Sequence, residues 1–372
     1  MRNLLIAVLS LPLLAVAIGC TACGSTPPTV KIGLVASFEG LYRPLGYEVL
    51  PAVKLAVSER NEAGGVGGHL VELVVLNDDQ DPNMAVQRAR EMVIDPDVMG
   101  VIGHFSDDTT VSALSTYHRA GLALVVPTAT SMEITGRGYP QTFRLVADNF
   151  FLGAAAARYA VTDKHATRLA AVRGSPDLVD AFVSEVEQEG GVVVLDIEAG
   201  DTRIITRLAD VNPELIFFGG EALEGAELLL KLQRAGLDIP MLGGNGLNGA
   251  CVVQIAGDAA EGTTYVAVTP PVEDQGFIEG CAQLSGAPPG PYAALAYNAT
   301  NLLLEALERS ITLRGKATRE GVVQALAEME VYRGLTGSVS FDERGQAVDR
   351  GVYIYEIVDE AYPGQLRGVR SG

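Results

Sequence analysis

Two short polar loops in the first half of the chain carry side chains that could bind a ligand. The first loop spans His104 to Asp108, and the second spans Pro127 to Ser131. Hydroxyl and carboxylate side chains gather in both loops, and groups of this kind fix the orientation of small polar ligands. The chemistry predicted from these residues is recognition of a solute.

A parallel sheet would bring the two loops together. The apolar runs before them, Val98 to Gly103 and Leu122 to Val126, are typical of strands buried on both faces. Between them, Thr109 to His118 has helical spacing of apolar residues, and Gly121 ends that helix. Because both loops then open at the carboxyl edge of one sheet, where such folds bind small molecules, we expect them to face one crevice.

Strands and helices alternate along the whole chain. The expected strands are 30–36, 70–76, 98–103, 122–126, 169–172, 192–197, 215–218, 241–242 and 265–268, and the expected helices are 45–63, 84–92, 109–118, 151–161, 179–189, 202–208, 222–235, 291–309 and 319–329. The pattern restarts after Val146, which predicts an α/β fold of two doubly wound Rossmann-like lobes. The chain is expected to return to the first lobe late in the sequence, so that several segments cross between the lobes and form a multi-strand hinge. The segments 337–341 and 351–358 are expected to pair as a terminal ribbon around a turn at 342–345.

Composition limits the possible partners. The 372 residues carry a formal net charge of −19, and no basic stripe interrupts this acidic balance, which argues against a nucleic-acid partner. Solubility outside the cell explains the acidity without any charged partner. Cys251 and Cys281 could form a disulfide in an oxidising compartment. They fall in different lobes, where a bond would block hinge motion, so free thiols are favoured and their oxidation state stays open.

The N-terminus has the pattern of an export signal. Arg2 precedes an apolar run from Leu4 to Ile18, which is too short to span a bilayer as a helix. The run ends in Ala17-Ile18-Gly19-Cys20, which resembles the lipobox of bacterial lipoproteins and would place a lipid on Cys20. The alternatives are an ordinary signal peptide cleaved nearby and the use of Cys23.

No motif for catalysis, a cofactor or a metal is present. The glycine cluster 64–68 follows a helix and precedes a strand, the reverse of a phosphate-binding loop. The acidic stretch 77–82 has Pro82 where a calcium loop needs glycine and Arg88 where it needs glutamate, so an N-cap is favoured there. His104 stands alone beside the predicted site, where a structural hydrogen-bonding role is favoured over that of a base. We expect no enzyme activity, no cofactor and no metal.

Several stretches together carry a family resemblance. They are Val30–Val35, Asn61–Gly68, Leu76–Pro82, Val101–His104, Pro127–Thr130, Gly138–Pro140 with Phe143–Arg144, and Gly334–Gly337 with Phe341–Asp342. In order and spacing they resemble type I periplasmic binding proteins of the leucine/isoleucine/valine-binding group, the solute-binding lipoproteins of ABC importers.

The resemblance implies two lobes that close on a small ligand, with hinge segments near Ala147, Pro270 and Thr336. The expected division is a signal peptide at 1–19, a tether at 20–29, a first lobe at 30–147 and 271–335, a second lobe at 148–270 and 336–365, and a tail at 366–372. The ligand-binding positions implied are Tyr42, Arg43, Leu45, Phe105, Ser106, Asp107, Thr128, Ala129, Thr130, Leu178, Glu221, Asn245 and Tyr292.

The chain departs from the amino-acid binders of that family at several of these positions. Asp107 stands where a serine helps to hold the ligand carboxylate, while Thr128 to Thr130 keep the groups that share it. Glu221 replaces an aromatic residue, Asn245 replaces the acid that pairs with the ligand ammonium, and a tyrosine expected near Asp177 and Leu178 is missing.

These departures bear on the solute. Asp107 or Asp108 would compete with a ligand carboxylate for free amides, unless one of them only caps the helix expected to begin near Thr109. Glu221 could replace the lost ammonium partner from across the cleft, and Arg43 could neutralise Asp107 or bind an anion. Leucine, isoleucine and valine are therefore expected to bind weakly, and an amide, polyol or amine to bind instead.

The function expected is that of an extracytoplasmic monomer, anchored by its lipid at the outer face of the membrane, that delivers a solute to an ABC permease. Two alternatives remain. A sensor of the same fold could signal through a partner, and an enzyme such as a glycosyltransferase could use two such lobes, although export and the missing phosphate cradle argue against the enzyme.

The lipid anchor gives the first testable prediction. Mature protein is expected to begin at Cys20, so the Cys20→Ser variant should lose incorporation of labelled fatty acid and the Cys23→Ser control should keep it. Intact mass of the purified protein reads out the same modification. Label that persists in Cys20→Ser would move the anchor to Cys23 or remove it.

Overall fold

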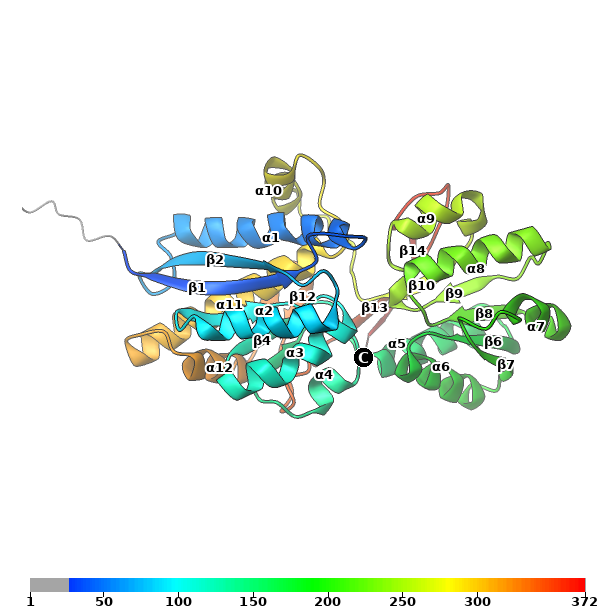
Figure 1. The fold of residues 1–372 in the computed structure, drawn as a ribbon, viewed down its shortest axis with the longest axis horizontal. Coiled ribbons are helices and arrows are strands. Elements are labelled where there is room, and N and C mark those ends of the chain that lie inside the picture. The colour runs from blue at the N-terminus through cyan, green and yellow to red at the C-terminus, as the bar shows by residue number, and fades with distance from the viewer. Residues whose placement is uncertain (1–26, 372) are drawn as a thin grey trace, which may run out of the picture.

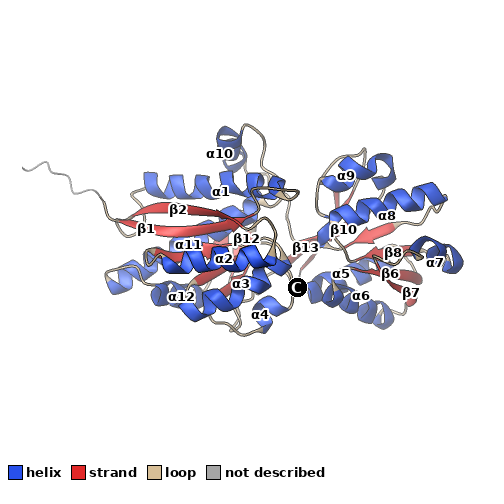
Figure 2. Ribbon diagram, viewed as in Figure 1, coloured by secondary structure: helices blue, strands red, loops and turns tan. Residues whose placement is uncertain are grey.

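Two α/β lobes lie side by side in a computed structural model that describes residues 27–371 (Figure 1). The predicted signal peptide, the anchor Cys20 and most of the 20–29 tether lie outside the described residues. Figure 2 shows helices flanking the strands of each lobe. The predicted α/β architecture of two doubly wound lobes is confirmed.

The first lobe is built on a parallel five-stranded sheet of order β2-β1-β3-β4-β5. Its strands are β1 (Thr29–Ala36), β2 (Leu70–Asn77), β3 (Val98–Ile102), β4 (Ala123–Val126) and β5 (Thr142–Arg144), and its helices are α1 (Arg43–Glu62), α2 (Pro82–Ile94), α3 (Asp107–Ala120), α4 (Glu133–Gly136), α10 (Gln275–Ser285), α11 (Ala293–Arg314) and α12 (Arg319–Ala327). Successive strand residues face opposite sides, so Leu34 packs in the core with α1 and α11 while Val35 packs with α2 and α3.

The second lobe has a seven-stranded sheet of order β14-β13-β10-β9-β8-β6-β7. Its strands are β6 (Arg168–Arg173), β7 (Val192–Glu198), β8 (Leu215–Phe218), β9 (Met241–Gly243), β10 (Thr264–Ala267), β13 (Gly351–Glu356) and β14 (Gln365–Ser371), and its helices are α5 (Asn149–Arg158), α6 (Pro176–Gln188), α7 (Ile204–Val211), α8 (Ala222–Ala235) and α9 (Cys251–Ala256). Phe217 stacks on Phe182 of α6 with ring centroids 3.9 Å apart, whereas its neighbour Phe218 enters the core under α8.

The predicted pairing of the two strands of the terminal ribbon is wrong, although the turn at 342–345 is present. Strand β12 (Gly337–Val339) pairs with β11 (Tyr332–Gly334), and β13 pairs instead with β10 and β14. The turn at 342–345 closes only a short antiparallel hairpin, in which Phe341 bridges Ala347 and the amide of Asp342 donates to the carbonyl of Gln346 at 2.8 Å. The carbonyl of Gly345 in this turn accepts a hydrogen bond from the amide of Arg144 at 2.8 Å. That contact holds the turn at the edge of the first sheet, while β13 lies in the second lobe.

The predicted tail at 366–372 is also wrong, because 365–371 forms the antiparallel edge strand β14. Polar and charged residues dominate this segment, since an edge strand is half exposed to solvent, and they concealed its strand character. The boundaries of the other predicted segments stay predictions.

The chain crosses between the lobes after β5, after β10 and before β13. Arg144 ties two of these crossings together, although it is fully buried. Its Nε donates to Gln346 Oε1 at 2.6 Å, and Gln346 Nε2 donates to the carbonyl of Val146 at 2.8 Å. Asn298 of α11 donates to the hydroxyl of Thr336 and accepts from the Leu335 amide at 2.9 Å. Buried polar bonds thus fix the chain close to the predicted hinge segments.

Candidate ligand-binding site

The two polar loops of the first lobe lie together, as predicted. The hydroxyl of Thr128 donates to the carbonyl of Phe105 at 2.8 Å, and the amides of Thr130 and Ser131 donate to Asp107 Oδ1 at 2.5 and 2.9 Å. The carboxyl edge of the sheet produces this contact, because β3 and β4 are adjacent parallel strands and both loops leave from the same side.

The alternative that one of the two aspartates only caps helix α3 is wrong. Helix α3 begins at Asp107, two residues before the predicted start, and Ser106 occupies the N-cap position. Asp107 therefore lies in the first turn and its carboxylate reaches the neighbouring loop, while Asp108 is exposed. Burial raises the pKa of Asp107, and the amides of Ser131 and Thr130 oppose that increase.

Residues of the second lobe meet this loop. Asn149, at the start of α5, donates through Nδ2 to Asp177 Oδ1 at 2.9 Å and lies 3.4 Å from Asp107 Oδ2. Asp177 Oδ2 accepts from the amide of Met132 at 3.0 Å, a hydrogen bond between the lobes. The sequence indicated neither Asn149 nor Met132 as a site residue, and it marked Asp177 only as lying near a missing tyrosine.

Glu221 and Asn245 come from neighbouring loops of the second lobe. Glu221 precedes α8 and its side chain makes no capping hydrogen bond. Glu221 is exposed, yet desolvation of its carboxyl group by the surrounding loops, followed by the negative charges of Asp107, Glu224 and Asp108, raises its pKa to about 7. Asn245 uses its Oδ1 to accept from the amide of Val268 at 3.1 Å, so this oxygen supports the backbone.

Close glycine contacts bring these loops together. A Cβ at Gly174 would lie 2.3 Å from the Cα of Gly220, which no side chain tolerates. The loop after β6 therefore touches the loop after β8, and the start of α6 lies beside Glu221 as a result.

Tyr292 contributes a second contact between the lobes. Its hydroxyl donates to the carbonyl of Asn248 at 3.1 Å, and its amide donates to Glu48 of α1. Glu48 was not predicted as a site residue. Burial raises its pKa to about 7, opposed by the amide hydrogen bonds of Tyr292 and Ala293. An acid four residues before Ala52, on the buried face of α1, was the signal in the sequence.

The remaining predicted residues divide into exposed and packed ones. Tyr42 and Arg43 are exposed at the start of α1. Partial desolvation of the Tyr42 hydroxyl, followed by the charge of Glu221, raises the pKa of Tyr42. Phe105, Ala129 and Leu178 are buried in the hydrophobic cores, and Leu45 is packed against one of them. These apolar residues shape the loops more than they offer polar contacts.

His104 has a structural role, as predicted. Its ring is fully buried, with Nδ1 2.7 Å from Asp78 Oδ2 and Nε2 3.1 Å from the hydroxyl of Tyr117. Burial would raise the pKa of Asp78, but hydrogen bonds from His104 and Ser37 hold it below its usual range. Nearby, Asp81 caps α2 by accepting from the Met84 amide at 2.7 Å, as expected for the acidic stretch.

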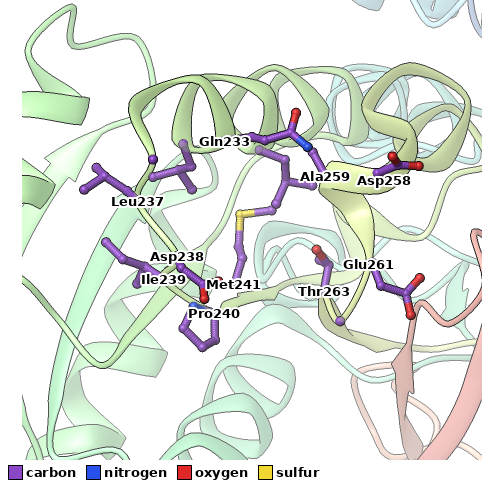
Figure 3. A pocket seen from close by; sticks show the side chains of 14 residues that line it. Gln233, Leu237, Asp238, Ile239, Pro240, Met241, Asp258, Ala259, Glu261 and Thr263 are labelled. Atoms are coloured by element: carbon purple, nitrogen blue, oxygen red, sulfur yellow. The ribbon is translucent and has the colours of Figure 1, made fainter.

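A surface cavity of about 490 Å³ lies elsewhere, between the end of α8 and the start of β9 (Figure 3). Gln233, Ile239, Asp258 and Glu261 are among its lining residues. This is the amino edge of the sheet, and none of the predicted site residues line the cavity.

Within residues 27–371 we find no cluster of three histidine, cysteine or acidic residues able to hold a metal, and no helix able to cross a membrane. Cys251 and Cys281 are free thiols.

Comparison with known proteins identifies a matching family and similar relatives. A family model described as periplasmic binding protein matches residues 29–361. The chain is 28% identical over 340 residues to the leucine-, isoleucine-, valine-, threonine- and alanine-binding protein of Pseudomonas aeruginosa, a match covering 88% of this chain and 90% of that protein.

Solved structures have the same fold. A leucine-binding protein of Thermotoga maritima matches with a TM-score of 0.81 at 24% identity, over 92% of this chain and 98% of that one. An ABC transporter substrate-binding protein of Desulfitobacterium hafniense in complex with leucine matches with a TM-score of 0.77 at 25% identity, over 91% of this chain and 99% of that one.

Glu48 gives a prediction on pH. Because its pKa in the folded state is raised, the native protein binds more protons than the unfolded chain between about pH 4.5 and 7, and this group lowers stability as pH rises through that interval. The Glu48→Gln variant should match the parent at pH 5 and exceed it by roughly 2–3 kcal/mol in unfolding free energy at pH 8.

Urea unfolding at both pH values measures this difference, with the exposed Glu227→Gln of α8 as the control. A Glu48→Gln difference that stays constant between pH 5 and pH 8 would contradict the assignment.

Proposed function

Since the chain belongs to the periplasmic binding protein family, as its sequence predicted, we propose that it captures a small solute between its lobes and delivers it to an ABC permease. The observation that carries the proposal is the meeting of polar groups from both lobes at the facing carboxyl edges of their sheets. Asp177 accepts from the amide of Met132, and Tyr292 donates to Asn248. A solute bound among such groups contacts both lobes at once.

Binding of a ligand between the lobes couples the occupancy of the site to the arrangement of the two lobes. A ligand that contacts both lobes favours the closed arrangement over the open one by its difference in affinity for the two. Three crossings connect the lobes, and Arg144 ties two of them together. Binding and release require no chemical step, and no reaction is proposed.

The location proposed is the outer face of the cell membrane. The apolar run and Ala17-Ile18-Gly19-Cys20 support export followed by lipid attachment at Cys20. A single monomer is sufficient, since one chain supplies both halves of the proposed site. A permease would then receive the closed, loaded form at the membrane surface.

The solute proposed is small and polar, either like an amino acid or an amide, polyol or amine. The name of the Pseudomonas aeruginosa relative and the leucine in the Desulfitobacterium hafniense structure support the first class. Asp107, Glu221 and Asn245, which differ from amino-acid binders, support the second. A sensor that signals through a partner would bind in the same way, and uptake of the solute by cells lacking this protein separates transport from sensing.

Closure is the direct prediction. A panel of amino acids, amides, polyols and amines should contain a compound that raises the melting temperature, since a ligand at 100 times its Kd adds about 2.7 kcal/mol of stability. Small-angle scattering at saturation with that compound should show a smaller radius of gyration than the free protein. A compound from the panel that leaves the melting temperature unchanged serves as the control, and an unchanged radius at saturation would count against closure.

A further inference from the structure

Three consecutive backbone amides lie where the two lobes meet, and all three donate to carboxylates of this same chain. Thr130 and Ser131 donate to Asp107 Oδ1 at 2.5 and 2.9 Å, and Met132 donates to Asp177 Oδ2 at 3.0 Å. Successive amides of this kind form a concavity that binds anions, which we call the amide nest (the N–H groups of 130–132). The nest is filled from within the protein.

Further contacts fix the two carboxylates in the nest. The hydroxyl of Thr130 lies 3.4 Å from Asp107 Oδ2, and Asn149 Nδ2 lies within 3.4 Å of Asp107 and 2.9 Å of Asp177. Arg144 Nη1 donates to the carbonyl of Ser131 at 2.5 Å, which places a buried positive charge behind the nest. Both half-buried aspartates are therefore paired with donors.

The side of the site facing the nest is also acidic. The charges of Asp107 and Asp108 from the first lobe act on Glu221 of the second, together with that of Glu224. A solute carboxylate that approached this region would meet like charges and find the amides already bonded. Solutes with amine, amide or hydroxyl donors would meet acceptors instead.

We propose that Asp107 and Asp177 permanently occupy the amide nest, so that the inter-lobe site excludes solutes that present a carboxylate to this loop and selects neutral or cationic ones. This inference rests on the proposed function, in which the inter-lobe site binds a solute. It narrows the solute to compounds that have no carboxylate at the end facing this loop. Asp107 acts here as a specificity-determining residue, because it takes the place that an anionic group of the solute would need.

Occupancy of the nest can be measured without knowing the natural solute. Sodium acetate is the probe, and the backbone amide signals of Thr130 and Ser131 in ¹⁵N-labelled protein report its binding. In the parent protein these signals should stay unchanged through millimolar acetate. In Asp107→Ser they should shift and saturate, and calorimetry should show at least a tenfold gain in affinity for L-leucine.

Asp108→Ser is the matched control, because it removes a neighbouring negative charge without freeing the nest. It measures the effect of charge removal alone and should show no saturable shift of Thr130 and Ser131. Of the nest amides, Asp177→Ser frees only that of Met132, and it provides a second variant should Asp107→Ser fold poorly. Among the three nest signals, that of Met132 alone should then respond to acetate. The dispersion of the amide spectrum confirms folding of each variant.

Saturable acetate shifts at Thr130 and Ser131 in the parent, or micromolar binding of L-leucine by the parent, would overturn the inference. So would folded Asp107→Ser and Asp177→Ser variants that respond to acetate no more than Asp108→Ser does. These outcomes are independent of closure: a protein that excludes acetate but never changes its radius with any bound compound would refute the proposed function and leave the filled nest standing.

Discussion

The bonding of the Asp107 carboxylate to the amides of Thr130 and Ser131 is the constraint on which the site depends. A carboxylate surrounded by protein needs donors, and the loop after β4 provides them only while it keeps its position next to the start of α3. Asn149 then extends the contact to Asp177, which reaches the next amide along the loop. The position of the second lobe against the first is thereby linked to the state of one side chain.

The order of strands and helices could be predicted from the sequence, because buried parallel strands leave apolar runs such as Val98 to Ile102 that the chain displays directly. The pairing of segments that lie far apart in the sequence could not be predicted. The turn near Gly345 closes a short hairpin as the local sequence indicates, but β13 then pairs with β10 of the second lobe, and no local pattern records that choice. The site shows the same limit. The sequence correctly indicated that Asp107 would compete for backbone amides, but the amides that it binds lie more than twenty residues away in the chain. Glu48 and Asn149 join the site through hydrogen bonds to residues that only the folded chain brings near them.

The family of this protein and the identity of its solute depend on different residues. The two lobes, the crossings and the facing carboxyl edges follow from the fold that residues 29–361 share with periplasmic binding proteins. In the function we propose, the solute is selected by a few side chains at those edges, where Glu221 lies near other acids and Asn245 uses its oxygen for the Val268 amide. A single fold can therefore serve different solutes through substitutions that leave its cores unchanged.

The most direct test of the filled nest is a crystal structure of the protein with the solute it retains on purification from its native cells. Asp107 should still accept from the amides of Thr130 and Ser131, with the solute presenting amine, amide or hydroxyl groups to Glu221 and its neighbours. A solute carboxylate bonded to those two amides, with Asp107 turned away, would contradict the assignment.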